Sequence, residues 1–271
     1  MKNISVLIPT YKPKEYIQKC FKSLETQTLN KKLFCVYVCL NGKKEPYEKY
    51  ILNLLSNISF NYKYLYEKKQ GVSNARNKLL EISRENFVIF LDDDDIISNN
   101  YLENLLNIAS KKYIGISNIY NFYNSIENLK QNYIGKTFCN IKDGEKSKFK
   151  TRKYYSSPWA KIIHKDIIDS IFFDTKLSKG EDALFMATIS KNIIGVKKTT
   201  NDTIYYVNER AGSITRQKVN LFIEIQRTLY TLRKYFSLFL DANYDKLFIL
   251  TRLIATFKNL FNIIKESFKN E

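Results

Sequence analysis

The chain has 271 residues, of which 44% are hydrophobic and only 8 are glycine and 4 proline. That composition indicates a folded protein with a substantial core and argues against a disordered or fibrous chain. The formal net charge is +17, so a basic surface could meet nucleic acid, an anionic membrane or acidic substrates. Four cysteines without a CxxC pair, beside a single histidine, argue against a zinc site and predict reduced thiols.

The chain opens with an apolar, β-branched run at residues 3–9 (NISVLIP), which predicts a buried strand. Nothing before it resembles a basic-then-apolar secretory leader, so we expect a cytoplasmic protein. Residues 9–13 break the strand. From residue 14 to about residue 27 the apolar positions recur at helical spacing, which predicts an amphipathic helix.

Strands and helices continue to alternate through the first half. Apolar runs predict strands at 33–40, 62–66 and 87–91, and helical spacing predicts helices at 46–56 and 71–82. Strands that are apolar throughout and alternate with helices indicate an α/β fold with a mostly parallel central sheet covered on both faces. In such sheets, ligands bind beyond the carboxyl ends of the strands.

Polar clusters follow three of these predicted strands. They are Thr10 with Tyr11, Asn41 with Gly42, and four aspartates at 92–95. We expect the clusters to meet at one edge of the sheet. Four adjacent carboxylates repel one another, increasingly as water is removed, so a compensating cation is expected. Capping of the next helix is the alternative explanation, but it needs only one aspartate, so we favour a metal site.

The sequence lacks the usual glycine-rich phosphate loops, since neither GxxxxGK[ST] nor GxGxxG follows the first strand. Phosphates at the sheet edge would then be neutralised by Mg²⁺ or Mn²⁺, which binds one or two carboxylates together with phosphate oxygens. In the second half, Glu181 and Asp182 precede an apolar helical run at 183–189. Such a pair either complements the helix dipole or supplies a general base.

Seven segments, in order, resemble the inverting family-2 glycosyltransferases, whose fold is named GT-A. SVLIPTYK resembles the first strand and turn of that family, SLETQT the end of its first helix, QGVSNARN its Gly-x-x-x-Ala-Arg-Asn segment, and FLDDDD its Asp-x-Asp strand end. PWAKIIHKDII resembles its Trp-x-Lys stretch, GEDALF its acceptor-side acidic motif, and YYVNERAGSIT the segment that closes the domain. The resemblance implies a GT-A catalytic domain at 1–215 and a C-terminal helical extension at 216–271.

The resemblance also implies roles for residues at the donor side. Thr10 and Tyr11 would line the nucleoside pocket, with the Tyr11 ring packed against the base. Arg76 would approach the base or the diphosphate. Asp93 would lie among these donor-binding residues, at the variable middle position of the Asp-x-Asp motif, and Asp95 is expected to cap the next helix.

For the metal and the proton transfer, the resemblance points to two pairs of acids. Asp94 would be the main ligand of Mn²⁺ or Mg²⁺, and Asp92 would hold the ribose or reach the metal through water. Asp182 would be the catalytic general base, and Glu181 would position it.

Asn41 stands where most members of the family carry an aspartate that accepts a hydrogen bond from uracil N3–H. An amide oxygen can accept the same bond, whereas the amide NH₂ could donate to cytosine N3. The donor base is therefore open between these two. An ordinary turn at Asn41 and Gly42 is the structural alternative.

Four residues of the second half are candidates for substrate binding. Trp159, the only tryptophan, could pack on a sugar ring or fill the core. Lys161 could approach the diphosphate or be a surface charge. Arg210 and Ser213 lie in a polar segment that could fold over the diphosphate or simply connect two elements.

After residue 215 the pattern is wholly helical, with two apolar stripes separated by residues 241–245. Residues 216–271 contain 10 Lys and Arg against 5 Asp and Glu, and Arg252 and Lys258 interrupt the apolar run, so we do not expect it to span a bilayer. The helices could pack on the catalytic domain or on a second subunit in a homodimer. Alternatively, they could form a basic amphipathic anchor on the cytoplasmic membrane surface.

The sequence thus predicts a metal-dependent inverting hexosyl- or N-acetylhexosaminyltransferase. It would use a nucleotide-sugar donor, a UDP-sugar first, and a glycan or lipid-linked acceptor in the synthesis of a bacterial surface polysaccharide or lipooligosaccharide. A nucleotidyltransferase is one alternative, but it would usually carry a Gly-rich basic loop after the first strand. A basic nucleic-acid-binding protein is another. The densest basic run, 142–153, has few aromatic residues and is predicted to be a solvated loop, so no nucleic-acid partner is expected.

Overall fold

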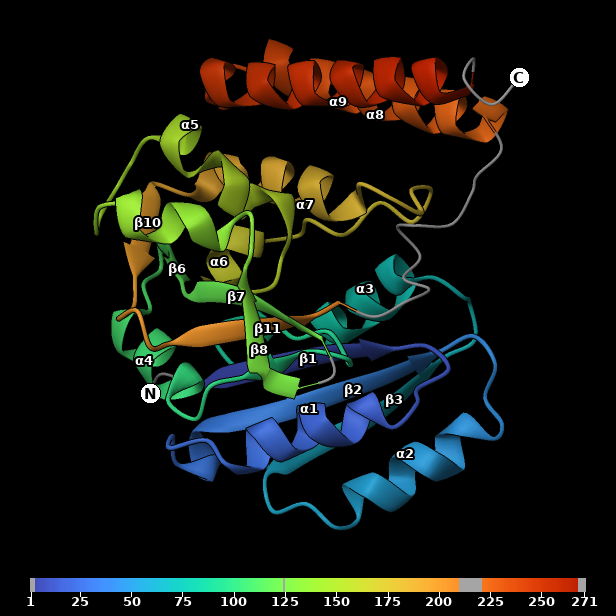
Figure 1. The fold of residues 1–271 in the computed structure, drawn as a ribbon, viewed down its shortest axis with the longest axis vertical. Coiled ribbons are helices and arrows are strands. Elements are labelled where there is room, and N and C mark those ends of the chain that lie inside the picture. The colour runs from blue at the N-terminus through green and yellow to red at the C-terminus, as the bar shows by residue number, and fades with distance from the viewer. Residues whose placement is uncertain (1–2, 124, 210–220, 268–271) are drawn as a thin grey trace.

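The computed structural model describes residues 3–123, 125–209 and 221–267 of the chain, and a seven-stranded sheet runs through its middle (Figure 1). From one edge to the other the strands are β10 (Gly195–Lys198), β6 (Tyr113–Ile116), β9 (Lys161–His164), β4 (Phe87–Phe90), β1 (Ile4–Thr10), β2 (Phe34–Asn41) and β3 (Asn61–Glu67). Strand β9 is antiparallel to both of its neighbours, whereas the other pairs in this sheet are parallel.

Strand β1 lies at the centre of the parallel part, with Ile4 opposite Phe34 of β2 on one side and Phe87 of β4 on the other. All seven residues of β1 are buried, because both faces of the sheet are covered. This burial explains the continuous apolar character of the strand in the sequence. The predicted α/β fold with a mostly parallel central sheet is confirmed.

Four α-helices lie in the described part of the first half of the chain. They are α1 (Tyr16–Glu25), α2 (Tyr47–Leu55), α3 (Val72–Ile82) and α4 (Tyr101–Ile108). Helix α1 buries Ile17, Cys20, Phe21 and Leu24, the positions whose helical spacing predicted it. The 3₁₀ turn η1 (Lys31–Leu33) leads into β2, with the Asn30 side chain accepting from the Lys32 N–H at 2.9 Å.

A second, smaller sheet lies beside the first and carries part of the site. Its four strands, in order, are β5 (Ile96–Ile97), β11 (Ile204–Asn208), β7 (Asn118–Tyr123) and β8 (Ser125–Gln131). Strand β5 follows the four aspartates directly and pairs with β11 through Ile97 and Tyr205. This pairing brings residues 204–208 next to the strand-end acids.

Shorter helices fill the second half of the domain. These are η2 (Gly135–Asn140), α5 (Lys148–Thr151), η3 (Arg152–Ser156), α6 (Lys165–Ile168), α7 (Glu181–Ile189) and η4 (Ser190–Asn192). Side chains of α7 join those of β1, β2, β4 and β9 in one contiguous hydrophobic core. The four cysteines are free thiols, as predicted.

The prediction of a solvated loop at 142–153 was wrong in its second half, where the chain forms α5 and begins η3. The Ser147 hydroxyl accepts a hydrogen bond from the Lys150 N–H at 3.3 Å and so caps α5, while Thr151 is buried. The capping serine and this buried threonine give the basic run a regular structure that its charge pattern concealed.

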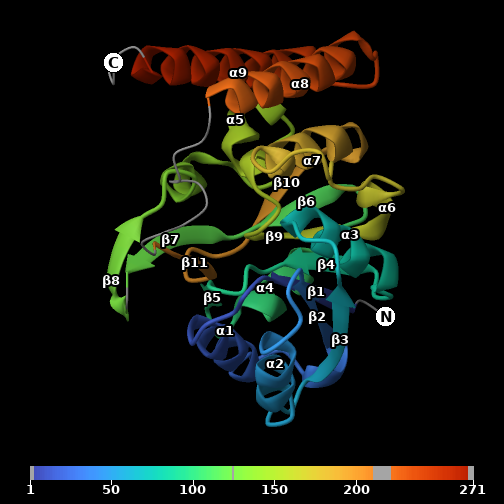
Figure 2. The same ribbon diagram turned by 90° about the vertical axis from the view of Figure 1, so that its right-hand side faces the viewer.

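Helices α8 (Leu221–Leu240) and α9 (Lys246–Ser267) pack on each other and form a layer at one end of the molecule (Figures 1 and 2). We refer to them as the C-terminal helix pair. Its inner side packs on α7 and α5. Within 3–123, 125–209 and 221–267, none of the helices combines the length and the hydrophobicity that a bilayer crossing requires. The predicted boundary between 215 and 216 falls outside the described residues.

The inner face of α8 buries both polar and apolar side chains. Glu224, Thr228 and Tyr235 are buried there, and the Tyr230 hydroxyl donates to an oxygen of Asp174 at 2.7 Å. In α9, Phe248 is fully buried and its ring centroid lies 4.8 Å from that of Tyr155. The apolar stripe noted in the sequence of α8 lies largely on the other face, in solvent; Leu221, Leu229 and Phe236 are exposed.

Candidate active site

The three polar clusters predicted to converge at the carboxyl ends of the strands do meet in the structure. The Asn41 amide Nδ2 donates to the Thr10 carbonyl oxygen at 2.8 Å, and the Thr10 hydroxyl donates to a carboxylate oxygen of Asp93. These contacts join the ends of β1, β2 and β4 because the three strands are parallel neighbours. The convergence was predictable from strand order alone.

Both polar atoms of the Asn41 amide form hydrogen bonds with backbone groups. In addition to its bond with Thr10, its Oδ1 accepts from the Gly71 N–H at 3.0 Å. One partner is a carbonyl and the other an N–H, so the orientation of the amide follows from its partners. Asn41 therefore ties the end of β2 to the start of α3, and its predicted contact with a nucleotide base stays a prediction.

Tyr11 is half-buried just beyond β1 and packs on the turn after β2. Gly42 has φ of +81°, and a Cβ there would come within 2.9 Å of Tyr11 Cε2. Glycine is therefore required by both backbone conformation and space. The Lys12 Nζ lies 5.1 Å from the centroid of the Tyr11 ring. An aromatic ring and a cation thus lie together at the edge of the sheet, a combination suited to a base or a phosphate.

Asp93 and Asp95 are the two buried members of the aspartate cluster. Asp93 is buried and accepts from Thr10. Asp95 is buried and accepts from the Asn208 N–H at 2.8 Å. Burial, together with the charges of Asp94 and Asp92, raises the pKa of Asp95 well above its ordinary value.

The prediction that Asp95 caps the next helix was wrong. Helix α4 begins at Tyr101, and the residue before it, Asn100, makes no capping bond through its side chain. Asp95 instead fixes the end of β11, because its carboxylate is turned toward the small sheet.

Asp92 and Asp94 are the two half-buried members of the cluster, and the side chain of Asp92 is 29% exposed. No group of three or more His, Cys, Asp or Glu in the described part of the chain is arranged to hold a metal ion. A hard divalent cation that binds a nucleotide needs only one or two carboxylates, since phosphate oxygens and water complete its shell. The donor chemistry of Asp92 and Asp94 fits such an ion.

Arg76 lies on α3 between the strand-end acids and the start of α7. Its Nη2 lies 3.0 Å from Asp92 Oδ1, and its Nη1 lies 2.5 Å from Asp182 Oδ1. Its side chain is 3% exposed, and its Nε has no hydrogen-bond partner among the described residues. Burial alone would lower the pKa of Arg76, but the nearby carboxylates raise it, so this side chain is a permanent cation.

The acids at the start of α7 follow Gly180, whose φ of +85° lies in the left-handed region. Glu181 is buried, and its Oε1 lies 3.9 Å from Arg76 Nη1. Burial raises the pKa of Asp182 to about 7, and the neighbouring Glu181 and Asp92 add to the rise against the opposing charges of Arg76 and Lys161. Such a value suits a group that takes up a proton near neutral pH.

Trp159 and Lys161 flank a strained residue, since Ala160 has φ of +58° without being glycine. The indole of Trp159 is half-buried and stacks on Tyr205, with ring centroids 5.2 Å apart. Lys161 is fully buried, and its Nζ donates to the Trp159 carbonyl at 2.7 Å. Burial lowers the pKa of Lys161 to about 7. The alternative of Lys161 as a surface charge was therefore wrong.

Tyr205 supports the acidic cluster, and no role was predicted for it from the sequence. Its hydroxyl accepts from the Asp92 N–H at 3.2 Å, and its ring stacks on Trp159. It lies in the YYVNERAGSIT segment, so the resemblance marked the region but gave no reason to single out this tyrosine. Arg210 and Ser213, predicted in the same segment, lie outside the described residues.

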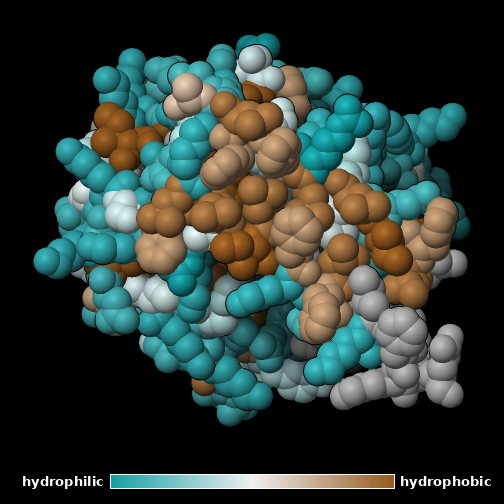
Figure 3. All heavy atoms as spheres, turned by 90° about the horizontal axis from the view of Figure 1, so that it is seen from above, coloured by the Kyte–Doolittle hydropathy of each residue, from teal (hydrophilic) through white to brown (hydrophobic). Residues whose placement is uncertain are grey.

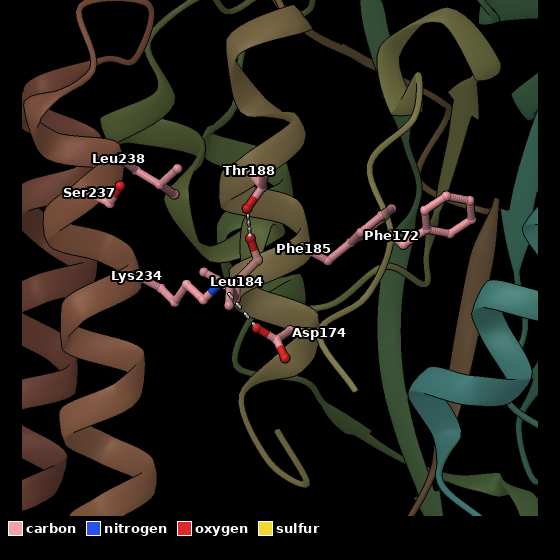
Figure 4. A pocket seen from close by; sticks show the side chains of 8 residues that line it. All are labelled: Phe172, Asp174, Leu184, Phe185, Thr188, Lys234, Ser237 and Leu238. Carbon is pink, nitrogen blue, oxygen red and sulfur yellow. Dashed lines mark hydrogen bonds and ion pairs between the residues drawn. The ribbon is translucent and has the colours of Figure 1, made fainter. Parts of the chain in front are cut away.

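A pocket of about 280 Å³ lies between α7 and α8, away from the acids (Figure 4). The figure shows Lys234 of α8 and Asp174 turned toward each other, with Nζ and Oδ2 3.5 Å apart. Neither Asp182 nor any of the aspartates at 92–95 lines this pocket. The pocket therefore belongs to the contact between α7 and α8.

Comparison with known proteins adds an independent line of evidence. A family model described as Glycosyl transferase family 2 matches residues 5–172. Glycosyltransferase GlyA of Streptococcus pneumoniae is 27% identical over 228 residues, which cover 79% of this chain and 31% of that protein. Poly(ribitol-phosphate) beta-N-acetylglucosaminyltransferase TarS of Staphylococcus aureus is 22% identical over 214 residues, 78% of this chain and 36% of that protein. The chain thus spans about a third of the length of these two relatives.

Solved structures show the same fold. The crystal structure of S. aureus TarS 1–349 in complex with UDP-GlcNAc has a TM-score of 0.76 at 20% identity and covers 94% of this chain and 72% of that one. Mannosyltransferase PcManGT from Pyrobaculum calidifontis, in complex with GDP-Man and Mn²⁺, has a TM-score of 0.64 at 11% identity. The match covers 97% of this chain and 73% of that one. At these identities the likeness concerns the fold, and the GT-A fold expected from the sequence is confirmed.

Proposed function

The chain belongs to glycosyl transferase family 2, and from that premise we propose that it transfers a hexose or N-acetylhexosamine, with inversion, from a nucleotide-sugar donor to a glycan acceptor. One observation carries the proposal. Arg76 contacts Asp92 at the end of β4 and Asp182 at the start of α7. The residues expected to hold the donor and the residue expected to activate the acceptor therefore border one site.

For the donor we propose a UDP-sugar. Tyr11 and Lys12 would receive the base and the diphosphate at the sheet edge, where the loops are held together by Asn41. The structure of TarS bound to UDP-GlcNAc supports this choice by its likeness in fold. Asp94 and Asp92 would hold Mn²⁺ or Mg²⁺, which when bound supplies positive charge to the departing diphosphate.

The acceptor hydroxyl must lose a proton as it attacks the anomeric carbon from the face opposite the leaving diphosphate. We propose that Asp182 takes this proton. Its burial favours the protonated product, and Arg76 orients the carboxylate before reaction. Glu181 lies beside it, also within reach of Arg76, and would keep that guanidinium in place. Trp159 would present an apolar ring surface to a sugar.

For the acceptor we propose a bacterial surface glycan, with a surface polysaccharide or lipooligosaccharide carried on a lipid as the expected setting. The name of TarS, a poly(ribitol-phosphate) beta-N-acetylglucosaminyltransferase, supports a polymer of the cell surface. Membership of the family also favours sugar transfer over the nucleotidyltransferase and the nucleic-acid-binding protein considered from the sequence.

A thermal-shift panel tests this function directly. UDP, GDP, CDP and their sugar conjugates would each be added with and without Mn²⁺. A ligand at a hundredfold excess over its Kd adds about 2.7 kcal/mol of stability, which raises Tm by roughly 5 °C or more. We expect that rise for a UDP-sugar in the presence of Mn²⁺. The absence of a shift with every nucleotide would contradict the proposal, and an equal shift without Mn²⁺ would remove the metal from it.

A further inference from the structure

The outward side of the C-terminal helix pair carries a continuous apolar surface. Viewed from that end of the molecule, hydrophobic residues gather over the two helices (Figure 3). We define the outer face by six exposed side chains, which are Leu229, Phe236, Leu250, Ile254, Phe257 and Phe261. The exposed fractions run from 42% for Leu250 to 68% for Phe261. Exposed apolar patches of this kind mark surfaces that bind a partner.

The residues of the outer face on α9 are spaced so that they lie along one side of the helix. In α9, residues 250, 254, 257 and 261 recur at intervals of four and three, so they lie along one side of the helix. The opposite side of α9 already has its partners, since Phe248 and Ile249 are fully buried against the rest of the protein. The helix pair therefore has enough apolar residues for two interfaces, of which the described structure fills one.

Cations are interspersed with this stripe. Arg233 lies four residues after Leu229 and three before Phe236, which places it on the same side of α8. Lys258 has the same relation to Ile254 and Phe261 on α9, and Lys265 follows Phe261 by four residues.

Among the side chains of α8 and α9 that the structure describes, no acid is exposed. Every exposed charged side chain that the structure describes in α8 or α9 is a lysine or an arginine. The acid of α8 in the described region, Glu224, is buried and ion-paired with Arg227 and Lys179. The outer face is therefore apolar and positively charged together.

This combination discriminates between two kinds of occupant. In a two-fold dimer the same patch would meet its own copy, so arginine and lysine would face arginine and lysine without acids to neutralise them. An anionic lipid surface supplies negative headgroups for the cations and hydrocarbon for the leucine, isoleucine and phenylalanine side chains. We propose that the outer face docks on a bilayer that contains anionic phospholipid. This proposal does not rest on the proposed sugar transfer.

The test uses the full chain and unilamellar vesicles of phosphatidylcholine, with or without phosphatidylglycerol, in a flotation assay. We expect flotation with the phosphatidylglycerol vesicles and much weaker flotation with phosphatidylcholine alone, together with weakening as salt is added. Failure of the unmodified chain to float with phosphatidylglycerol, or equal flotation with both vesicles, would overturn the proposal.

Two sets of substitutions separate the apolar and electrostatic contributions. The triple variant Ile254→Ser, Phe257→Ser and Phe261→Ser should lose flotation to background. The variant Arg233→Gln, Lys258→Gln and Lys265→Gln should lower partitioning into phosphatidylglycerol vesicles by about a hundredfold, roughly fivefold for each cation. All six positions are exposed, so thermal unfolding should stay unchanged in both variants. Unchanged vesicle binding in either variant would overturn the proposal.

Matched controls come from exposed positions elsewhere. Ile126→Ser with Leu129→Ser alters two exposed apolar residues of β8, and Lys22→Gln, Lys49→Gln and Lys130→Gln remove three exposed cations. Both controls should float like the unmodified chain. Sedimentation velocity on the same proteins addresses the rival occupant. If the unmodified chain is a dimer that does not bind vesicles, and the apolar variant is a monomer, the outer face would instead be the contact with a second copy of the chain.

Discussion

The Arg76 guanidinium donates to Asp182 across 106 positions of sequence, with Nη1 and Oδ1 only 2.5 Å apart. Both groups are substantially buried, with side-chain exposures of 3% and 23%. An ion pair in such a place depends on its partners, since removing one member leaves an uncompensated buried charge.

Substitution of Arg76 by methionine should therefore destabilise the fold. We expect a loss of about 3–5 kcal/mol, because Asp92 and Asp182 lose their common cation. Protonation can relieve the unpaired acids, so the loss should be larger at alkaline than at acid pH. Urea unfolding at several pH values measures it. Arg84→Met, at an exposed position, is the control, and an equal, pH-independent effect of the two substitutions would contradict the assigned role.

Two aspartates should separate donor binding from chemistry. Asp94→Asn and Asp182→Asn are both expected to abolish sugar transfer. Only Asp94→Asn should weaken Mn²⁺-dependent binding of the donor, because Asp182 is assigned to the acceptor proton. Calorimetric titration of the nucleotide sugar with and without Mn²⁺ measures this difference. Asp166→Asn, whose side chain is 65% exposed, should alter neither property. Equal loss of donor affinity in both site variants would remove Asp182 from the role of base.

The pH dependence of transfer should report the state of Asp182. Its pKa is raised to about 7 by burial, and a general base works only when deprotonated. We expect kcat/KM to fall tenfold per pH unit below that value and to level off above it. Lys161 also titrates near pH 7, because burial lowers its pKa to about 7. In Lys161→Met, kcat/KM should still fall below about pH 7. Loss of that fall in the variant would identify Lys161, and not Asp182, as the titrating group.

The buried Lys161 should also make the free energy of unfolding depend on pH. Its pKa is lowered on folding, so between about pH 7 and pH 10 the unfolded chain binds more protons and the stability of the native protein rises with pH. Below about pH 7 the folded protein contains a protonated, buried Lys161, so the free-energy cost of burying that charge is present in full. The free energy of unfolding of Lys161→Met, relative to that of the unmodified chain, should therefore be highest near pH 7. This difference should shrink toward pH 10, by at most about 1.4 kcal/mol per pH unit.

Urea unfolding across the same window measures the difference. Lys111→Met, at a side chain that is 73% exposed, should follow the unmodified chain throughout. Parallel stability curves for Lys161→Met and the unmodified chain would mean that the buried lysine keeps its proton at every pH tested.

The sheet and the convergence at its edge could be predicted because they follow from local signals. Continuous apolar runs such as residues 34–40 read as strands buried on both faces, and polar residues directly after them must then gather at the carboxyl edge. The contact between Asn41 and Thr10 is the direct result. The acids at the start of α7 were also found, since a glycine and two acids precede an apolar helical run.

The remaining features depend on tertiary partners that have no local signature. The spacing of Asn41 gives no sign that its amide is held by the backbone of Thr10 and Gly71. Lys161 reads as a surface residue because lysine is almost never fully buried. Arg76 was expected at the base or diphosphate, and its pairing with Asp182 required knowledge of where α7 packs. Hydrophobic periodicity located the stripe on α8 but could not say which side meets the protein.

Helix α8 divides its residues cleanly between its two sides. Glu224, Leu232 and Tyr235 are buried on the side that faces the body of the protein, whereas Leu229 and Phe236 are exposed on the other side. Because the two sets share no member, outward residues can drift or be engineered for solubility while the attachment of the helix stays intact. Such substitutions would give a better-behaved protein for crystallisation without disturbing its architecture.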